Sequence, residues 1–260
     1  MATSKTFLPR EHGAWVQLAL PLLGALLPGS PTAAAGCMTA AVTLGFLAHE
    51  PLLIALGHRG KRALDLQGRA AWRRFVVLGL AAVGFGVAAA VLASPTARLA
   101  ALGFVVPAAL VAPLLLRRRE RSTGFEVGVS VALAGAAPMV AVASGLSPRI
   151  ATLHGLLWAT TFAAETLSAR GVLAMSGKRA RSRRLLVWAT VVALAGLGGA
   201  IAAFAAGVAG GALVWAAAPV VPVTAYVLWR PPHAKQLFAV GVAMAVTGTL
   251  SLVALLVGPV

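Results

Sequence analysis

The sequence predicts an all-α integral membrane protein, a bundle of nine transmembrane helices. Its 260 residues are 60% hydrophobic and only 11% charged, and the mean hydropathy is +0.91. Soluble domains are typically about 45–50% apolar and about 25% charged. Nine apolar stretches are long enough to cross a bilayer, and Lys and Arg concentrate in alternate connections between them. These observations exclude a soluble enzyme, a disordered tail and a disulfide-rich secreted domain.

Each predicted span has a length that can cross a hydrocarbon core of about 30 Å as a helix. Turn-forming Pro, Gly and Ser follow the first, third, fifth and seventh spans, whereas basic segments follow the second, fourth, sixth and eighth. No connection is long enough for a separate soluble domain, so we expect residues 1–260 to form a single transmembrane domain. The predicted spans are 13–29, 33–57, 75–93, 98–116, 124–144, 150–170, 185–207, 209–229 and 236–258.

The distribution of basic residues predicts the orientation of the chain. The formal net charge is +16, and of the 22 Lys and Arg residues all but Arg98 and Arg149 fall in the N-terminal tail or in the connections after even-numbered spans. Short cytoplasmic loops accumulate Lys and Arg. We therefore expect a cytoplasmic N-terminus and an external C-terminus, and we do not expect a nucleic-acid partner despite the high charge.

Four of the six acidic residues fall near the predicted cytoplasmic ends of spans. Glu11 and Glu50 are 39 residues apart, and so are Glu126 and Glu165. This repeated spacing is consistent with an internal duplication that would bring the four carboxylates to one cytoplasmic mouth. Glu50 and Glu165 lie within apolar runs, where a carboxylate is costly unless it is paired, ligated or hydrated.

Structural explanations compete with a functional role for these residues. Glu126 follows Thr123 by three residues, the spacing of a capping box at the start of a helix. Glu165 precedes Arg170 by five residues and could form an ion pair with it. For Glu50 we favour a polar cavity, because His49 precedes it and Pro51, which removes a backbone donor, follows it.

Basic residues follow both helices that carry an intramembrane glutamate. Carboxylates can hold a divalent cation, and the cation together with Lys and Arg can hold a diphosphate whose apolar tail lies between helices. Contact with anionic lipid headgroups is the alternative role of these basic residues. The scattered histidines could in principle ligate haem, but nothing in their spacing is specific to it. The single cysteine, Cys37, has no partner within the chain and is expected to serve packing.

The segment Arg10-Glu11-His12-Gly13-Ala14-Trp15, with Pro21 further along, resembles the signature of the YwiC-like family of bacterial multi-pass membrane proteins. This resemblance implies a location in the bacterial cytoplasmic (inner) membrane.

The wider organisation resembles the UbiA superfamily of intramembrane prenyltransferases: nine helices, a cytoplasmic N-terminus, and long cytoplasmic loops after the second and sixth helices. In that superfamily, aspartate-rich motifs on those two helices bind Mg²⁺ and a prenyl diphosphate. The matching positions here are His49-Glu50 and Glu165, and each lacks the second acid of the motif, since Leu53 and Ala169 stand there.

The resemblance implies a prenyltransferase-like enzyme that acts on a prenyl diphosphate in contact with membrane lipid. Glu50 and Glu165, with Glu11, would bind Mg²⁺, and His12 or His49 would act as the base beside the catalytic glutamates. The residues expected to bind the diphosphate are Arg59, Lys61, Arg62, Lys178 and Arg179. The alternative function is a non-enzymatic transporter or binding protein for a small anionic or amphiphilic molecule.

Overall fold

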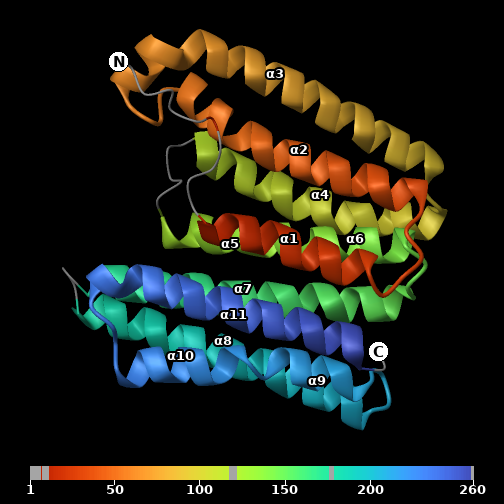
Figure 1. Cartoon of the computed structure of the whole chain (residues 1–260), viewed down its shortest axis with the longest axis vertical. Helices are drawn as coiled ribbons and strands as arrows, with labels where there is room; N and C mark the ends of the chain where they lie inside the picture. Colours follow the sequence, from red (N-terminus) through yellow and green to blue (C-terminus); the bar gives the residue numbers. More distant parts are fainter. Residues whose placement is uncertain (1–6, 8–11, 117–121, 176–178, 259–260) are drawn as a thin grey trace.

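The computed structural model describes residue 7 and residues 12–116, 122–175 and 179–258. Over these residues the chain is all-α, as predicted, and its helices run side by side (Figure 1). The helix α1 begins and α11 ends at opposite ends of the bundle. The α-helices are α1 (His12–Leu26), α2 (Ala33–Ala55), α3 (Lys61–Leu92), α4 (Pro95–Leu116), α5 (Thr123–Ala134), α6 (Ala136–Ala143), α7 (Pro148–Ala174), α8 (Arg179–Ala205), α9 (Gly211–Ala217), α10 (Val220–Trp229) and α11 (Leu237–Val257), with a 3₁₀ turn, η1 (Ala234–Gln236), before the last.

Six helical stretches of the described residues are long and apolar enough to cross a membrane, which supports a multi-pass membrane protein. Two of them are each made of two consecutive helices, α5 with α6 and α9 with α10. The helices α1 and α4 add shorter apolar segments. Each of the nine stretches expected from the sequence overlaps a single helix of the described part of the chain or one of the two pairs, α5 with α6 and α9 with α10.

Prolines interrupt the two broken helices. Helix α5 ends at Ala134, with Gly135 as its C-cap, and Pro138 cannot donate the helical hydrogen bond to the carbonyl of Ala134. In the same way, Pro222 cannot donate to Ala218, where α9 gives way to α10. The apolar pattern alone predicted uninterrupted helices at both places.

The polar connection expected at about residues 58–74 is mostly helical, because α3 begins at Lys61 and extends to Leu92. Its first half alternates Lys and Arg with Leu, Ala and Gln, all of which are good helix formers. The basic segment is therefore an extension of a membrane-spanning helix, and not a loop.

Helix α7 lies at the centre of the packing and contacts α5, α6 and α8 most extensively. On α7, Trp158 and Phe162 are fully buried and stack with their ring centroids 5.4 Å apart. By contrast, α3 lies at the edge of the bundle and packs chiefly against α2 (Figure 1). The core therefore surrounds α7, and the α2–α3 hairpin forms the periphery.

Candidate functional site

A cavity of about 1880 Å³ lies inside the bundle. Sites for drug-sized ligands are typically about 300–1,000 Å³, so this cavity has room for a larger molecule. Its wall is formed by α2, α3 and α4 and by parts of α1, α5, α6, α7 and α11. Most of the lining is apolar, and charged side chains gather at one end, at residues 50, 59, 126 and 170. We call these four residues the mouth of the cavity.

Glu50 is held at the mouth by Arg59. The Nε atom of Arg59 donates to Oε1 of Glu50 at 2.8 Å, and its Nη2 atom donates to Oε2. Nine residues span about 13 Å along a straight helix, so the two side chains would not meet if α2 continued. Instead α2 ends at Ala55, and Gly57 and Gly60, with φ of 73° and 93°, turn the chain back. The carboxylate, 5% exposed, is thereby neutralised in a bidentate pair.

Glu126 joins α5 to α7 through an ion pair. Its Oε2 atom lies 2.9 Å from Nε of Arg170. The capping box predicted with Thr123 is wrong, because the N-cap of α5 is Ser122, whose hydroxyl accepts from the backbone N–H of Phe125. The structure therefore places Arg170 beside Glu126, and not in the pair with Glu165 that the sequence left open.

Glu165 lines the same cavity, and no cationic side chain among the described residues pairs with it. It is 5% exposed, and within the described part of the chain it accepts a hydrogen bond at Oε1 from the hydroxyl of Thr247 of α11, at 3.0 Å. Along α7, Glu165 lies nine residues before Ala174, which is about 13 Å from that end of the helix. A buried carboxyl group without a counter-ion at such depth is a marker of a functional site in membrane proteins.

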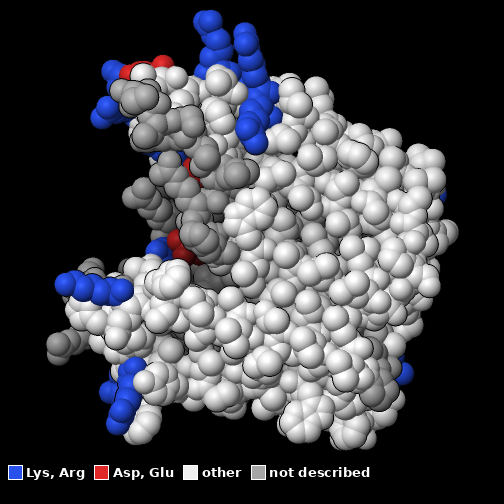
Figure 2. Space-filling model, in the orientation of Figure 1, with Lys and Arg blue, Asp and Glu red and all other residues white. Residues whose placement is uncertain are grey.

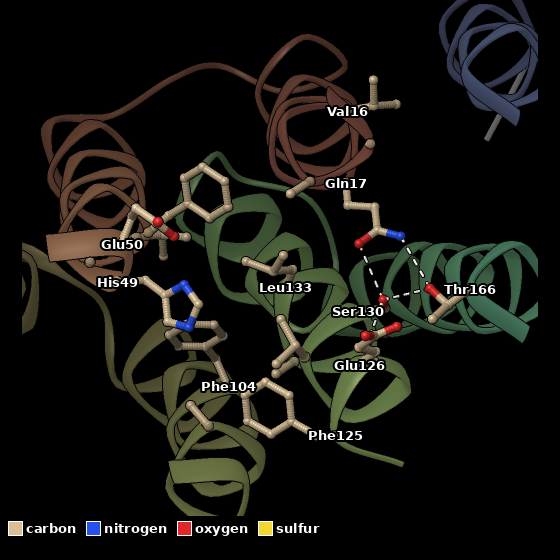
Figure 3. A pocket seen from close by; sticks show the side chains of 18 of the residues that line it. Val16, Gln17, His49, Glu50, Phe104, Phe125, Glu126, Ser130, Leu133 and Thr166 are labelled. Atoms are coloured by element: carbon tan, nitrogen blue, oxygen red, sulfur yellow. Dashed lines mark hydrogen bonds between the residues drawn. The ribbon is translucent and has the colours of Figure 1, made fainter. Parts of the chain in front are cut away.

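A neutral polar cluster on the cavity wall was not predicted from the sequence. Figure 3 shows Gln17, Ser130 and Thr166 pointing toward one another from α1, α5 and α7. The Oγ atom of Ser130 and the Oγ1 atom of Thr166 are hydrogen-bonded at 2.8 Å. The Ser130 hydroxyl also donates to Oε1 of Gln17 at 3.2 Å, and Nε2 of Gln17 donates to Oγ1 of Thr166 at 3.3 Å. Its one sequence signal is proximity to acids, since Ser130 stands four residues after Glu126 and Thr166 directly follows Glu165.

The structure brings part of the predicted site together. His49, Glu50, Arg59 and Glu165 all line the cavity. Lys61 and Arg62, in the first turn of α3, are exposed and lie off its wall. The roles predicted for all of these residues remain predictions. Four further residues of the predicted site lie outside the described residues or have side chains that are not described: Glu11, His12, Lys178 and Arg179.

The described donors do not fit the predicted Mg²⁺ site. Both oxygens of Glu50 accept hydrogen bonds from Arg59, and Oε1 of Glu165 accepts one from Thr247. Within residues 12–116, 122–175 and 179–258, no group of three or more His, Cys, Asp or Glu side chains could hold a metal ion. Mg²⁺ prefers an octahedral set of oxygen ligands. The described residues therefore do not support a reaction step that depends on a bound metal ion.

Basic side chains surround the end of the bundle at which the mouth lies. Figure 2 shows the molecule hollowed on that side, with acidic side chains visible within the hollow and Lys and Arg around it. Among the described basic residues near the mouth are Lys61, Arg62, Arg69, Arg73 and Arg74 in the first half of α3. Such a field attracts anions toward the opening.

These features define a polytopic α-helical membrane protein with a large internal cavity that is charged at one end. The chain belongs to the YwiC-like protein family, whose model matches residues 8–141, as the segment around Gly13 predicted. The match extends from α1 into α6 and includes Glu50, Arg59 and Glu126, while Glu165 lies beyond it. No curated protein and no solved structure matches the chain.

Proposed function

We propose that this protein binds an amphiphile in its cavity, with an apolar chain between the helices and an anionic headgroup at the mouth. The observation that carries the proposal is the division of one cavity into an end where four charged side chains gather and a long, mostly apolar remainder, which also holds the buried carboxyl group of Glu165 and, at its far end, Arg98. The wall extends from Arg59 at one end of α2 to Arg98, which lies near the start of α4 at the other end of the helices. A molecule that fills the cavity therefore needs both a charged group and an apolar chain.

The apolar part favours a chain and not a compact ligand. The α2 face contributes Met38, Val42, Phe46 and Leu53, which follow one another at helical spacing along the cavity. Burial of a methylene group contributes about 0.8 kcal/mol. A long chain along this face therefore supplies much of the binding free energy without any polar contact.

The mouth favours an anionic headgroup. The guanidinium groups of Arg59 and Arg170 are each held in place by a glutamate, and their side chains are 37% and 22% exposed. A guanidinium presents a fork of N–H donors that matches phosphate and carboxylate oxygens. The basic first half of α3 adds an attractive field around the same opening.

Binding of farnesyl phosphate to the protein in phosphatidylcholine nanodiscs tests this proposal. We expect farnesyl phosphate to bind more tightly than farnesol or inorganic phosphate, since each of those lacks one of the two parts. Arg170→Gln and Arg59→Gln should each weaken binding by about 10–100-fold, as expected for loss of a charged hydrogen bond of about 1.5–3 kcal/mol.

Arg73→Gln is the matched control, because Arg73 is an exposed residue on α3 that lies off the cavity wall. It removes the same charge near the same end of the bundle. Equal affinity for farnesyl phosphate and farnesol, or equal weakening by Arg73→Gln and Arg170→Gln, would contradict the proposal.

Prenyl transfer, predicted from the UbiA resemblance, is a second candidate for the same cavity. It is favoured by the presence of His49, Glu50 and Arg59 on one stretch of the wall. In such a reaction the allylic C–O bond breaks and diphosphate leaves with the electron pair. The acceptor then bonds to the allylic carbon and gives its proton to a base, for which His49 is the described candidate.

Diphosphate release tests the second candidate separately. Purified protein incubated with farnesyl diphosphate, with and without Mg²⁺ and with water as the acceptor that bonds to the allylic carbon, should release diphosphate faster than the His49→Ala and Glu50→Gln variants do. Release no faster than from these variants, together with retained binding of farnesyl phosphate, would leave the binding function and exclude transfer from this substrate.

A further inference from the structure

The cavity opens sideways between α3 and α4. Val83 and Val87 of α3 and Leu102 and Val105 of α4 line it, yet these four side chains are 64%, 59%, 56% and 53% exposed. The described residues of α3 and α4 also make almost no contact with each other, so nothing in the described part of the chain closes the cavity between these exposed side chains.

Packing explains why this side is open. Helix α3 packs chiefly against α2, whereas α4 packs mainly against α5 and α6. The lining residues of α3 include those at 83, 86, 87 and 90, and the lining residues of α4 include those at 101, 102, 105 and 108. Each set follows the spacing of a single helix face. Each helix therefore turns an apolar face to the shared space, although a short connection joins the two in sequence.

The opening lies at the level of the hydrocarbon core. From Phe75 to Leu92 and from Leu99 to Leu116 the sequence contains no charged residue, and α3 has the length and hydropathy of a membrane span. Water and ionic solutes are excluded from that region of a bilayer, whereas lipid chains fill it. The molecules that meet the opening are therefore lipid chains.

Two glycines, Gly86 and Gly45, leave open space inside the opening because they carry no side chain. A side chain added at Gly86 of α3 or at Gly45 of α2, both on the cavity wall, would have no atom within 4 Å of its Cβ. Buried interiors are normally close-packed, so such space on two facing helices is available to a ligand.

From this geometry we propose that the apolar chain of a bilayer lipid enters the cavity sideways between α3 and α4. The inference rests on the proposed function in that it supplies the route and the lipid nature of the bound chain. Entry by this route requires no particular headgroup, because the side chains at the opening, Val83, Val87, Leu102 and Val105, carry no charge.

The test uses phosphatidylcholine nanodiscs in which a fraction of the lipid carries a photoreactive diazirine in its acyl chain. Met38 of α2 and Met139 of α6 line the cavity but are only 4% and 5% exposed, so lipid outside the bundle does not reach them. We expect photolabelling of the peptides that contain these two residues. Gly86→Phe should lower that labelling by about tenfold, which corresponds to a loss of roughly 1.4 kcal/mol in occupancy of the opening.

Gly84→Phe is the matched control, since Gly84 lies on the same helix, has equally open surroundings and does not line the cavity. Val87→Trp is a second blocking variant, used with thermal unfolding of each protein to verify that it is folded. Labelling confined to outward residues such as Val77 and Leu80, or labelling of Met38 that Gly86→Phe and Val87→Trp leave unchanged, would overturn the inference. Farnesyl phosphate binding that persists alongside either result would show that the route is wrong while the binding function stands.

Discussion

The Nε atom of Arg170 lies 2.9 Å from Oε2 of Glu126, and this pair joins α7 to α5 at the mouth of the cavity. The two side chains are 22% and 36% exposed, so solvent screens their attraction. We expect a double-mutant cycle with Glu126→Gln and Arg170→Gln to give a coupling energy below about 1 kcal/mol in the free energy of unfolding. Reversible unfolding in detergent micelles measures it, and a coupling well above this limit would show that the pair is desolvated.

The Glu50–Arg59 pair should respond asymmetrically to substitution. Arg59→Gln leaves a glutamate whose side chain is 7% exposed without this cation, whereas Glu50→Gln leaves a guanidinium whose side chain is 37% exposed and can be hydrated. We expect Arg59→Gln to lower the free energy of unfolding by about 1.5–3 kcal/mol, and Glu50→Gln to lower it less. The double variant should regain part of the loss. Equal effects of the two single substitutions would argue against this account of the pair.

Thr247 should matter only while Glu165 is present. Its hydroxyl donates to Glu165 and to the backbone carbonyl of Met244, at 3.0 and 2.8 Å. Thr247→Val removes this hydrogen bond from a buried carboxyl group, which should cost about 1–3 kcal/mol. In a Glu165→Leu background the same substitution should have little effect. Additive effects in the two backgrounds would contradict the assigned contact.

Close packing of α6 on α7 predicts a large effect at Gly155. A Cβ added there would lie 2.4 Å from Cγ of Pro138, whose ring cannot rotate away. We expect Gly155→Ala to destabilise the protein by about 1–3 kcal/mol through overpacking. Gly198 of α8 is the control, because an added Cβ meets nothing within 4 Å, and Gly198→Ala should stabilise its helix by about 0.5–1 kcal/mol. Thermal unfolding of the two variants compares them directly.

Cysteine labelling tests the predicted orientation. Cys37 is the only cysteine, so Cys37→Ala provides a background without thiols. In intact cells, a membrane-impermeant maleimide should label Arg149→Cys, whereas Lys235→Cys should react only after lysis, because the basic connections are expected in the cytoplasm. The opposite pattern would reverse the orientation and place the mouth outside the cell.

The apolar stretches and the turn formers between them predicted the helical class and the place of each helix in the sequence, because these depend on local sequence. They did not predict that α3 begins at Lys61 or that two of the spans are broken at prolines. The repeated spacing of the glutamates predicted that Glu50 and Glu165 would meet in one cavity, and both line it. Pairing was not predictable in the same way. Arg59 reaches Glu50 only because the chain reverses direction at Gly57 and Gly60. Arg170 pairs with Glu126 because α5 packs against α7. The Gln17–Ser130–Thr166 cluster depends on three helices distant in sequence and left almost no local signal.

Among the described helices, α3 packs chiefly against α2. Moving it outward would therefore disturb one helix pair and leave the densely packed surroundings of Trp158 intact. The cavity would then discriminate little between bound molecules of different thickness, since a thicker molecule is accommodated when α3 moves outward. Selectivity must come instead from the polar groups around Glu50 and Glu126, so that related proteins with different occupants are expected to differ there more than along α3.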